Sequence, residues 1–119
     1  MRIGDLAKLT GVSASTIRFY EIQGLLPAPA RLANGYRDYD RHAVEIVKFI
    51  DRARNLGFGL REVAAHLRLP RGEERKARLQ AQLEAKLSEL DAHIAQVRAR
   101  RAMISDLVEE VRQSRTPKH

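Results

Sequence analysis

The stretch TGVSASTIRFYEIQGLL, residues 10–26, decides how the first half of this 119-residue chain folds. Ser13 is a good amino-terminal cap for a helix, and Gly24 is the kind of residue that follows the end of one. The helix predicted between them has apolar residues that favour burial, such as Ile17, and a hydroxyl-rich start that carries Arg18. These polar side chains predict a binding partner outside the fold.

The residues in front of this stretch predict another short helix. Residues 3–10, IGDLAKLT, place several apolar side chains near one helical face, and Gly11 follows as a residue that ends a helix. Two short helices joined by a tight turn form a helix-turn-helix pattern. The pattern is only moderately specific, because any small helical hairpin resembles it. The apolar residues of the first helix are Ile3, Leu6, Ala7 and Leu9.

The next segment, LLPAPARLANGYRDYD at residues 25–40, predicts a two-stranded ribbon. Pro27 and Pro29 exclude a helix there. Asn34-Gly35 is a strong hairpin signal, because both residues tolerate a positive φ, and the flanks ARL and YRDY are short enough to be two strands. Because a lone ribbon of this size is unstable in water, we expect it to lean on the helices as a wing.

Two further helices are predicted before the chain changes character. Asp40 is a good cap for a helix over RHAVEIVKFIDRARNLGF, residues 41–58, whose apolar residues recur at helical spacing. Residues 60–67, LREVAAHL, predict a fourth helix. We place the end of the first domain at residue 70 and a polar linker at residues 71–76.

A heptad pattern dominates the rest of the chain and predicts a long helix over residues 77–112. Apolar residues recur there at alternating steps of four and three, with a single polar interruption. The alternative is a helix packed on its own domain, but a helix about 51 Å long is too long for a 70-residue head to cover. We therefore expect a second copy of the helix as partner and a disordered tail at residues 113–119. The seam comprises Leu83, Leu87, Leu90, Ile94, Val97, Arg101, Ile104, Val108 and Val111.

Composition limits the possible functions. The 22 Lys and Arg outnumber the 15 Asp and Glu, which gives a net charge of +7 and favours nucleic acid or another anionic surface over a merely basic protein. The chain has no cysteine, so disulfides and thiolate metal sites are excluded. No apolar run approaches the ~20 residues of a membrane span, and the start lacks the apolar segment of a secretory signal. We therefore expect a cytoplasmic protein without a membrane partner.

Four segments in this order and spacing resemble the mercury-resistance regulator (MerR) family of bacterial transcription factors. They are IGDLAKLTGVSASTIRFYEIQGLL, NGYRDYD, ARNLGFGLREVAAHL and the long heptad helix, which together cover residues 1 to about 112. The resemblance implies a mainly α fold: a winged helix-turn-helix DNA-binding head at residues 1–70 and an antiparallel coiled-coil dimer through residues 77–112. It also implies binding to an inverted repeat in an overlong promoter spacer, which such dimers bend and untwist for bacterial RNA polymerase.

The resemblance and the side-chain chemistry together give the expected DNA contacts. Arg18 fits guanine O6 and N7 or a phosphate. Arg37 matches the family's arginine that contacts the DNA backbone, with pairing to Asp38 or Asp40 as the alternative. Phe19 stands where many relatives have tyrosine, and it cannot donate a hydrogen bond. The full set of expected contacts is Ser13, Ser15, Thr16, Arg18, Phe19, Tyr20, Tyr36 and Arg37.

The effector cannot be read from the sequence. Relatives that sense soft metals use cysteines, and the four histidines of this chain lack the spacing of a metal site, so we expect no metal and no cofactor. An organic small molecule, or no effector, is favoured. An enzyme is not expected, because no catalytic constellation is present. Two alternatives stay open: an architectural, excisionase-like DNA-binding protein, and a coiled-coil module that binds other proteins.

Overall fold

Glycine and hydroxyl residues end and begin the first two helices as the sequence predicts. In the computed structural model, which describes residues 1–115, α1 spans Ile3–Thr10 and α2 spans Ala14–Ile22. Gly11 ends α1 with a left-handed φ of 72° and donates its backbone N–H to the carbonyl of Ala7 at 2.9 Å. The Ser13 hydroxyl then accepts a hydrogen bond from the Thr16 N–H at 3.2 Å and caps α2.

The wing is shorter than predicted. Strand β1 is Ala30–Arg31 and β2 is Arg37–Asp38, and the two pair antiparallel with Arg31 opposite Arg37. Asn34-Gly35 lies in the loop that joins the two antiparallel strands, as predicted, but of these two residues only Gly35 has a positive φ. The Asn34 side chain instead accepts a hydrogen bond from the Tyr36 N–H at 3.1 Å and stabilises a longer loop.

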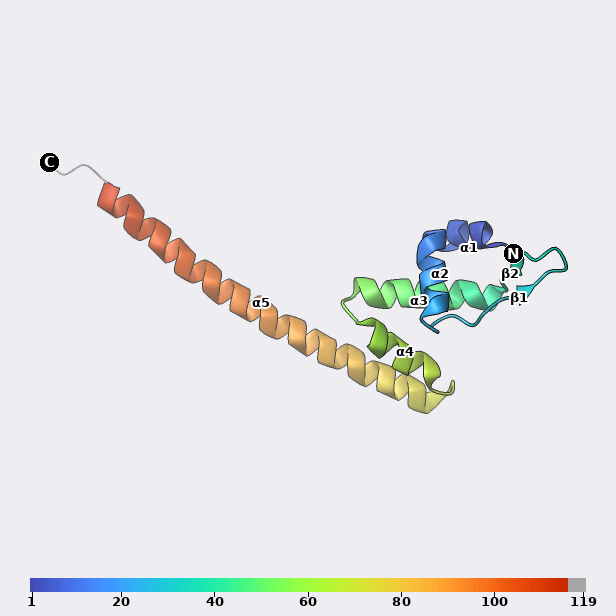
Figure 1. The fold of residues 1–119 in the computed structure, drawn as a ribbon. Helices are drawn as coiled ribbons and strands as arrows, with labels where there is room; N and C mark the ends of the chain where they lie inside the picture. The colour runs from blue at the N-terminus through green and yellow to red at the C-terminus, as the bar shows by residue number, and fades with distance from the viewer. Residues whose placement is uncertain (116–119) are drawn as a thin grey trace. The chain divides into compact units, whose positions relative to one another are not determined.

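The core of the head lies between the helices and the base of the wing. Helix α3 is Arg41–Asn55, with Asp40 as its cap, and α4 is Leu60–Arg68. Helix α1 packs against α2 and α3, and α3 packs against α4 (Figure 1). Leu9 does not belong to this core, contrary to prediction. It is 57% exposed, because it lies on the side of α1 that faces away from the core. The core comprises Leu6, Val12, Ile17, Tyr20, Leu25, Leu26, Tyr39, Ala43, Val47, Ile50, Phe58 and Val63.

Helix α5, Glu73–Arg115, is longer at both ends than predicted. It is about 65 Å long at 1.5 Å per residue. Most of the predicted linker is helical, because Glu73 and Glu74 suit a helix amino terminus and Glu74 pairs with Arg78 one turn later at 3.7 Å. Residues 113–115 of the predicted tail are also helical, and residues 116–119 lie outside the described part.

The chain divides into two compact units at Pro70 and Arg71, and the mainly α class with a winged helix-turn-helix head and a long following helix is confirmed. Along α5, every apolar residue of the predicted seam is exposed in the single chain. None of the helices in residues 1–115 combines the length and the apolar character needed to cross a membrane.

A matched pair of substitutions on α1 tests this core. Leu6 is fully buried, so Leu6→Ala should lower the free energy of unfolding by about 2–5 kcal/mol. Leu9→Ala, three residues later on the exposed face, should change it by less than about 0.5 kcal/mol. Urea unfolding of both variants and the wild type at one protein concentration measures the difference. Equal losses for the two variants would contradict the described packing.

Candidate nucleic-acid interface

Helix α2 presents one buried face and one exposed face. Ile17 and Tyr20 are 0% and 1% exposed, and they fix the helix against the rest of the head. Ser15, Arg18 and Phe19 lie on the opposite, exposed side. The ring of Tyr20 belongs to the core, and the DNA contact of its hydroxyl stays a prediction.

The hydroxyls at the start of α2 form a small network. Besides capping the helix, Ser13 donates its hydroxyl hydrogen to Thr16 Oγ1 at 2.8 Å, and its oxygen lies 3.2 Å from the Ser15 hydroxyl. Ser13 thus acts as a cap, and the network fixes the hydroxyls at the end of the helix where backbone N–H groups favour an anion.

A carboxylate joins α2 to the wing. Glu21 Oε2 accepts a hydrogen bond from Arg37 Nη1 at 3.2 Å and one from the Tyr39 hydroxyl at 3.3 Å. The Glu21 side chain is only 11% exposed, whereas that of Arg37 is 36% exposed. The ion pair thus leaves the outer side of the Arg37 guanidinium open to a further anion.

The two acidic residues considered as partners of Arg37 have other roles. Asp38 Oδ1 accepts a hydrogen bond from the amino group of Met1 at 2.8 Å, and Asp40 Oδ1 accepts one from the Ala43 N–H at 3.0 Å. The alternative considered from the sequence, in which Arg37 pairs with Asp38 or Asp40, is therefore wrong. Arg37 is paired, but across the fold to α2.

Tyr39 supports the same junction from inside the core. Burial of its ring raises the pKa of its phenol above the ordinary value of 10.0, and the Glu21 carboxylate raises this pKa further, while Arg37 acts in the opposite direction. The phenol is therefore protonated near neutral pH and able to donate its hydrogen bond to Glu21.

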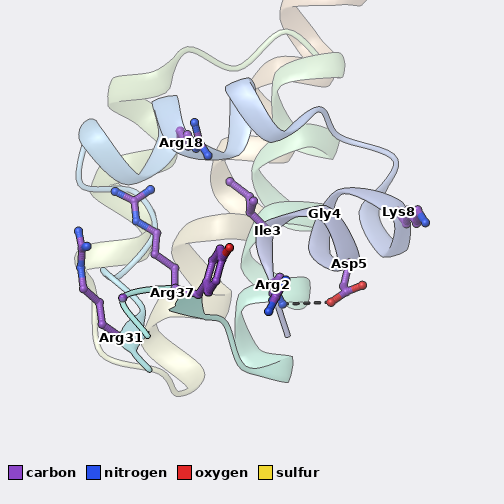
Figure 2. Close-up of a pocket in the computed structure, with 10 residues that line it drawn as sticks. Arg2, Ile3, Gly4, Asp5, Lys8, Arg18, Arg31 and Arg37 are labelled. Atoms are coloured by element: carbon purple, nitrogen blue, oxygen red, sulfur yellow. Dashed lines mark hydrogen bonds between the residues drawn. The ribbon is translucent and has the colours of Figure 1, made fainter. Parts of the chain in front are cut away.

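Cationic side chains from α1, α2 and the wing line a cleft of about 630 Å³ on the head. Figure 2 shows Arg31 and Arg37 reaching out from the wing, with Arg18 on α2 above them. The one carboxylate in the lining, Asp5, accepts a hydrogen bond from the Arg2 N–H at 3.1 Å, at the start of α1. The cleft therefore has a strong excess of positive charge, suited to a row of phosphates. The five cationic lining residues are Arg2, Lys8, Arg18, Arg31 and Arg37.

Three of the expected contact residues meet in this cleft: Arg18, Tyr36 and Arg37. The guanidinium carbon of Arg2 lies 4.2 Å from the centre of the exposed Tyr36 ring, a cation–π contact that joins the start of α1 to the wing. The other expected contacts lie outside the lining, one as the cap of α2 and the rest on α2 itself: Ser13, Ser15, Thr16, Phe19 and Tyr20.

Sequence reasoning missed Arg2, Lys8 and Arg31 as lining residues. All three are exposed basic residues in segments already assigned to the head. A projection of the first helix would have shown Lys8 on the side away from the core. The contribution of Arg31 depends on its pairing opposite Arg37 in the wing, which no local pattern gives.

One of the four histidines belongs to the interior of the head. His66 is 6% exposed, and its ring stacks on Phe49 with centroids 4.9 Å apart. Among residues 1–115, no group of three or more His, Asp or Glu side chains has the arrangement of a metal site.

Comparison with known proteins places the chain among transcription regulators. Sequence profiles described as "MerR family regulatory protein" and "MerR, DNA binding" match residues 2–39 and 44–107. The chain is 37% identical over 119 residues to the HTH-type transcriptional regulator HmrR of Sinorhizobium medicae, covering all of this chain and 73% of that protein.

Solved structures agree with this comparison. MerR of Bacillus megaterium MB1, in complex with mercury(II), is 30% identical, with a TM-score of 0.70 over 100% of this chain and 89% of that one. HiNmlR, a MerR family regulator lacking the sensor domain and bound to promoter DNA, has a TM-score of 0.54 over 92% of this chain and 78% of that one. Its 22% identity supports the fold alone.

The Tyr39 environment predicts a stability effect at alkaline pH. Because the pKa of Tyr39 is raised in the folded state, the unfolded chain loses this proton first as pH rises above about 10. The stabilisation from Tyr39 is thus complete below pH 10 and is lost above it. Urea unfolding of wild type and Tyr39→Phe is measured between pH 8 and 11. Above pH 10, the free energy of unfolding of the wild type should fall relative to that of Tyr39→Phe. A constant difference would contradict the buried phenol.

Proposed function

Because the chain belongs to the MerR family of DNA-binding transcriptional regulators, we propose that it acts as a homodimer that binds an inverted repeat in promoter DNA. The observation that carries the proposal is the cleft between α1, α2 and the wing, with five cationic side chains and one carboxylate. In such a complex the exposed face of α2 enters the major groove, and the wing follows the phosphate backbone. A head that binds protein has no comparable need for this concentration of positive charge.

The roles of individual residues follow from their positions. Arg31 and Arg37, on paired strands, contact successive phosphates, and Arg18 contacts a guanine edge or a phosphate at the wall of the groove. Glu21 does not contact DNA. It orients Arg37 through the 3.2 Å ion pair, so that the arginine is held ready before DNA arrives.

The exposed apolar seam of α5 is the reason for proposing a dimer. Its apolar seam, from Leu83 to Val111, is exposed in the single chain, and monomeric proteins rarely keep such a stripe uncovered. A second α5 in antiparallel orientation covers it and gives the protein two heads, which an inverted repeat requires. We also propose that the bound dimer deforms the promoter spacer and that RNA polymerase responds to this change.

Thiophilic metals do not suit this chain as effectors. Mercury(II) is bound by the Bacillus megaterium relative, but soft metals prefer thiolate ligands, and this chain supplies none. An organic effector, or none, remains our prediction. Calorimetric titration of the dimer with Hg, Cd, Cu(I) and Zn in a competing buffer tests it, and submicromolar stoichiometric binding of any of them would contradict it.

The phosphate contacts predict a specific salt dependence. A duplex selected from a randomised pool with the full chain should bind with an affinity that falls steeply with salt. Arg31→Ala should lower the slope of log K against log salt by about one for each subunit, and it should weaken all sequences alike. Arg100→Ala, which removes the same charge from α5, is the control. Fluorescence anisotropy measures the affinity of both variants at several salt concentrations. An unchanged slope for Arg31→Ala would contradict the assignment of the cleft as the phosphate-binding site.

A charge placed in the seam tests the dimer. Ile94 is an apolar seam residue of α5, and Ile94→Asp puts an unpaired carboxylate at the interface, which should raise the dimer dissociation constant at least tenfold. Ala99→Asp, which places the same charge on the side of the helix opposite the seam, should leave it unchanged. Sedimentation equilibrium measures both variants. A wild type that sediments as a 13.5 kDa monomer at micromolar concentration would overturn the proposal.

A further inference from the structure

Two apolar side chains on the exposed face of α2 lie outside the core of the head. Ile22 is 80% exposed and Phe19 is 40% exposed, and neither belongs to the core. The spacing of residues 15, 18, 19 and 22 places both on the same face as Ser15 and Arg18. The Phe19 ring is tilted against Tyr20 with centroids 6.3 Å apart, which limits its movement.

We propose that Ile22 and Phe19 recognise the 5-methyl group of thymine in the major groove, and so select A·T pairs beside the base pair that Arg18 contacts. The inference rests on the proposed function, since it requires α2 to enter the groove. Thymine is the only base that presents a methyl group in the major groove, whereas the other groups that distinguish the bases there are hydrogen-bond donors or acceptors. An exposed aliphatic residue therefore has one chemical partner on that surface.

The division of charge on the head supports this assignment. Arg18 lines the cationic cleft, whereas Ser15, Phe19 and Ile22 do not. The cleft and the wing thus suit the phosphates, and the uncharged side chains beside Arg18 on α2 suit the base edges. A surface that contacts only phosphates gains nothing from an exposed isoleucine such as Ile22 at the end of α2, because an aliphatic side chain offers no hydrogen bond to an anion.

The spacing along α2 gives the distance between the two recognised bases. Ile22 follows Arg18 by one helical turn, which is about 6 Å at 1.5 Å per residue. Base pairs are about 3.4 Å apart along the duplex. With α2 lying along the major groove, the selected thymine lies within about two base pairs of the base or phosphate that Arg18 contacts.

Replacement of thymine by deoxyuridine removes the methyl group alone and so tests the inference. Each thymine of a selected duplex is replaced in turn, and dissociation constants are measured by anisotropy for the wild-type dimer. Loss of one buried methyl contact should weaken binding about threefold to fivefold at the recognised position. Ile22→Ser should bind the thymine and uridine duplexes equally well, and Phe19→Ala should show a reduced difference. Leu9→Ser, which changes a 57% exposed leucine on α1, is the control and should keep the wild-type difference.

The outcomes separate the inference from the function on which it depends. A wild type that binds a selected duplex tightly but is indifferent to every uridine would overturn methyl recognition and leave DNA binding intact. A uridine effect that persists in both Ile22→Ser and Phe19→Ala would assign the methyl contact to other residues and overturn the inference as well. Failure to enrich any duplex would overturn the proposed function itself. Because Ile22 is 80% exposed, its replacement is not expected to disturb folding, and circular dichroism of the variant checks this.

Discussion

Glu21 accepts hydrogen bonds from Arg37 and Tyr39, and the arrangement of the whole binding surface depends on this junction. The strands of the wing are two residues each, too short to be stable by themselves. Their position relative to α2 is set by the buried Tyr39 ring and by this shared carboxylate. A carboxylate in a mostly positive surface looks unfavourable for DNA binding, but here it is nearly buried and faces inward. It holds a guanidinium in place and leaves the outer surface cationic.

Local sequence patterns predicted most of the fold because the fold is largely local. Gly11 and Ser13 act within a few residues of themselves, and their roles as helix end and helix cap follow from backbone geometry alone. The start of α5 was misplaced because its charged residues resemble a solvated linker. Their spacing at three and four residues lets them pair along a helix, as Glu74 and Arg78 do.

The candidate site was less predictable, because it depends on contacts between distant segments. Arg37 was identified from the sequence, but its partner lies 16 residues away on another element. Asp38 and Asp40 were closer along the chain and were considered first, although Asp38 accepts a hydrogen bond from the amino group of Met1 and Asp40 caps α3. Tyr20 had the chemistry of a phosphate donor, yet the packing of α2 requires its ring in the core. Residue type gives what a side chain is able to bind, and the tertiary fold decides whether it is available.

The exposed apolar seam of α5 has a consequence for how such a protein responds to its own abundance. Because α5 buries no residue in the single chain, the stability of this helix is linked to association with another copy. Below the dimer dissociation constant, the concentration of two-headed molecules rises with the square of the number of chains made. If the dimer binds an inverted repeat as proposed, occupancy of that site then increases more steeply than gene expression does. A modest change in synthesis or proteolysis of the chain thereby becomes a sharper change at the promoter, without any ligand.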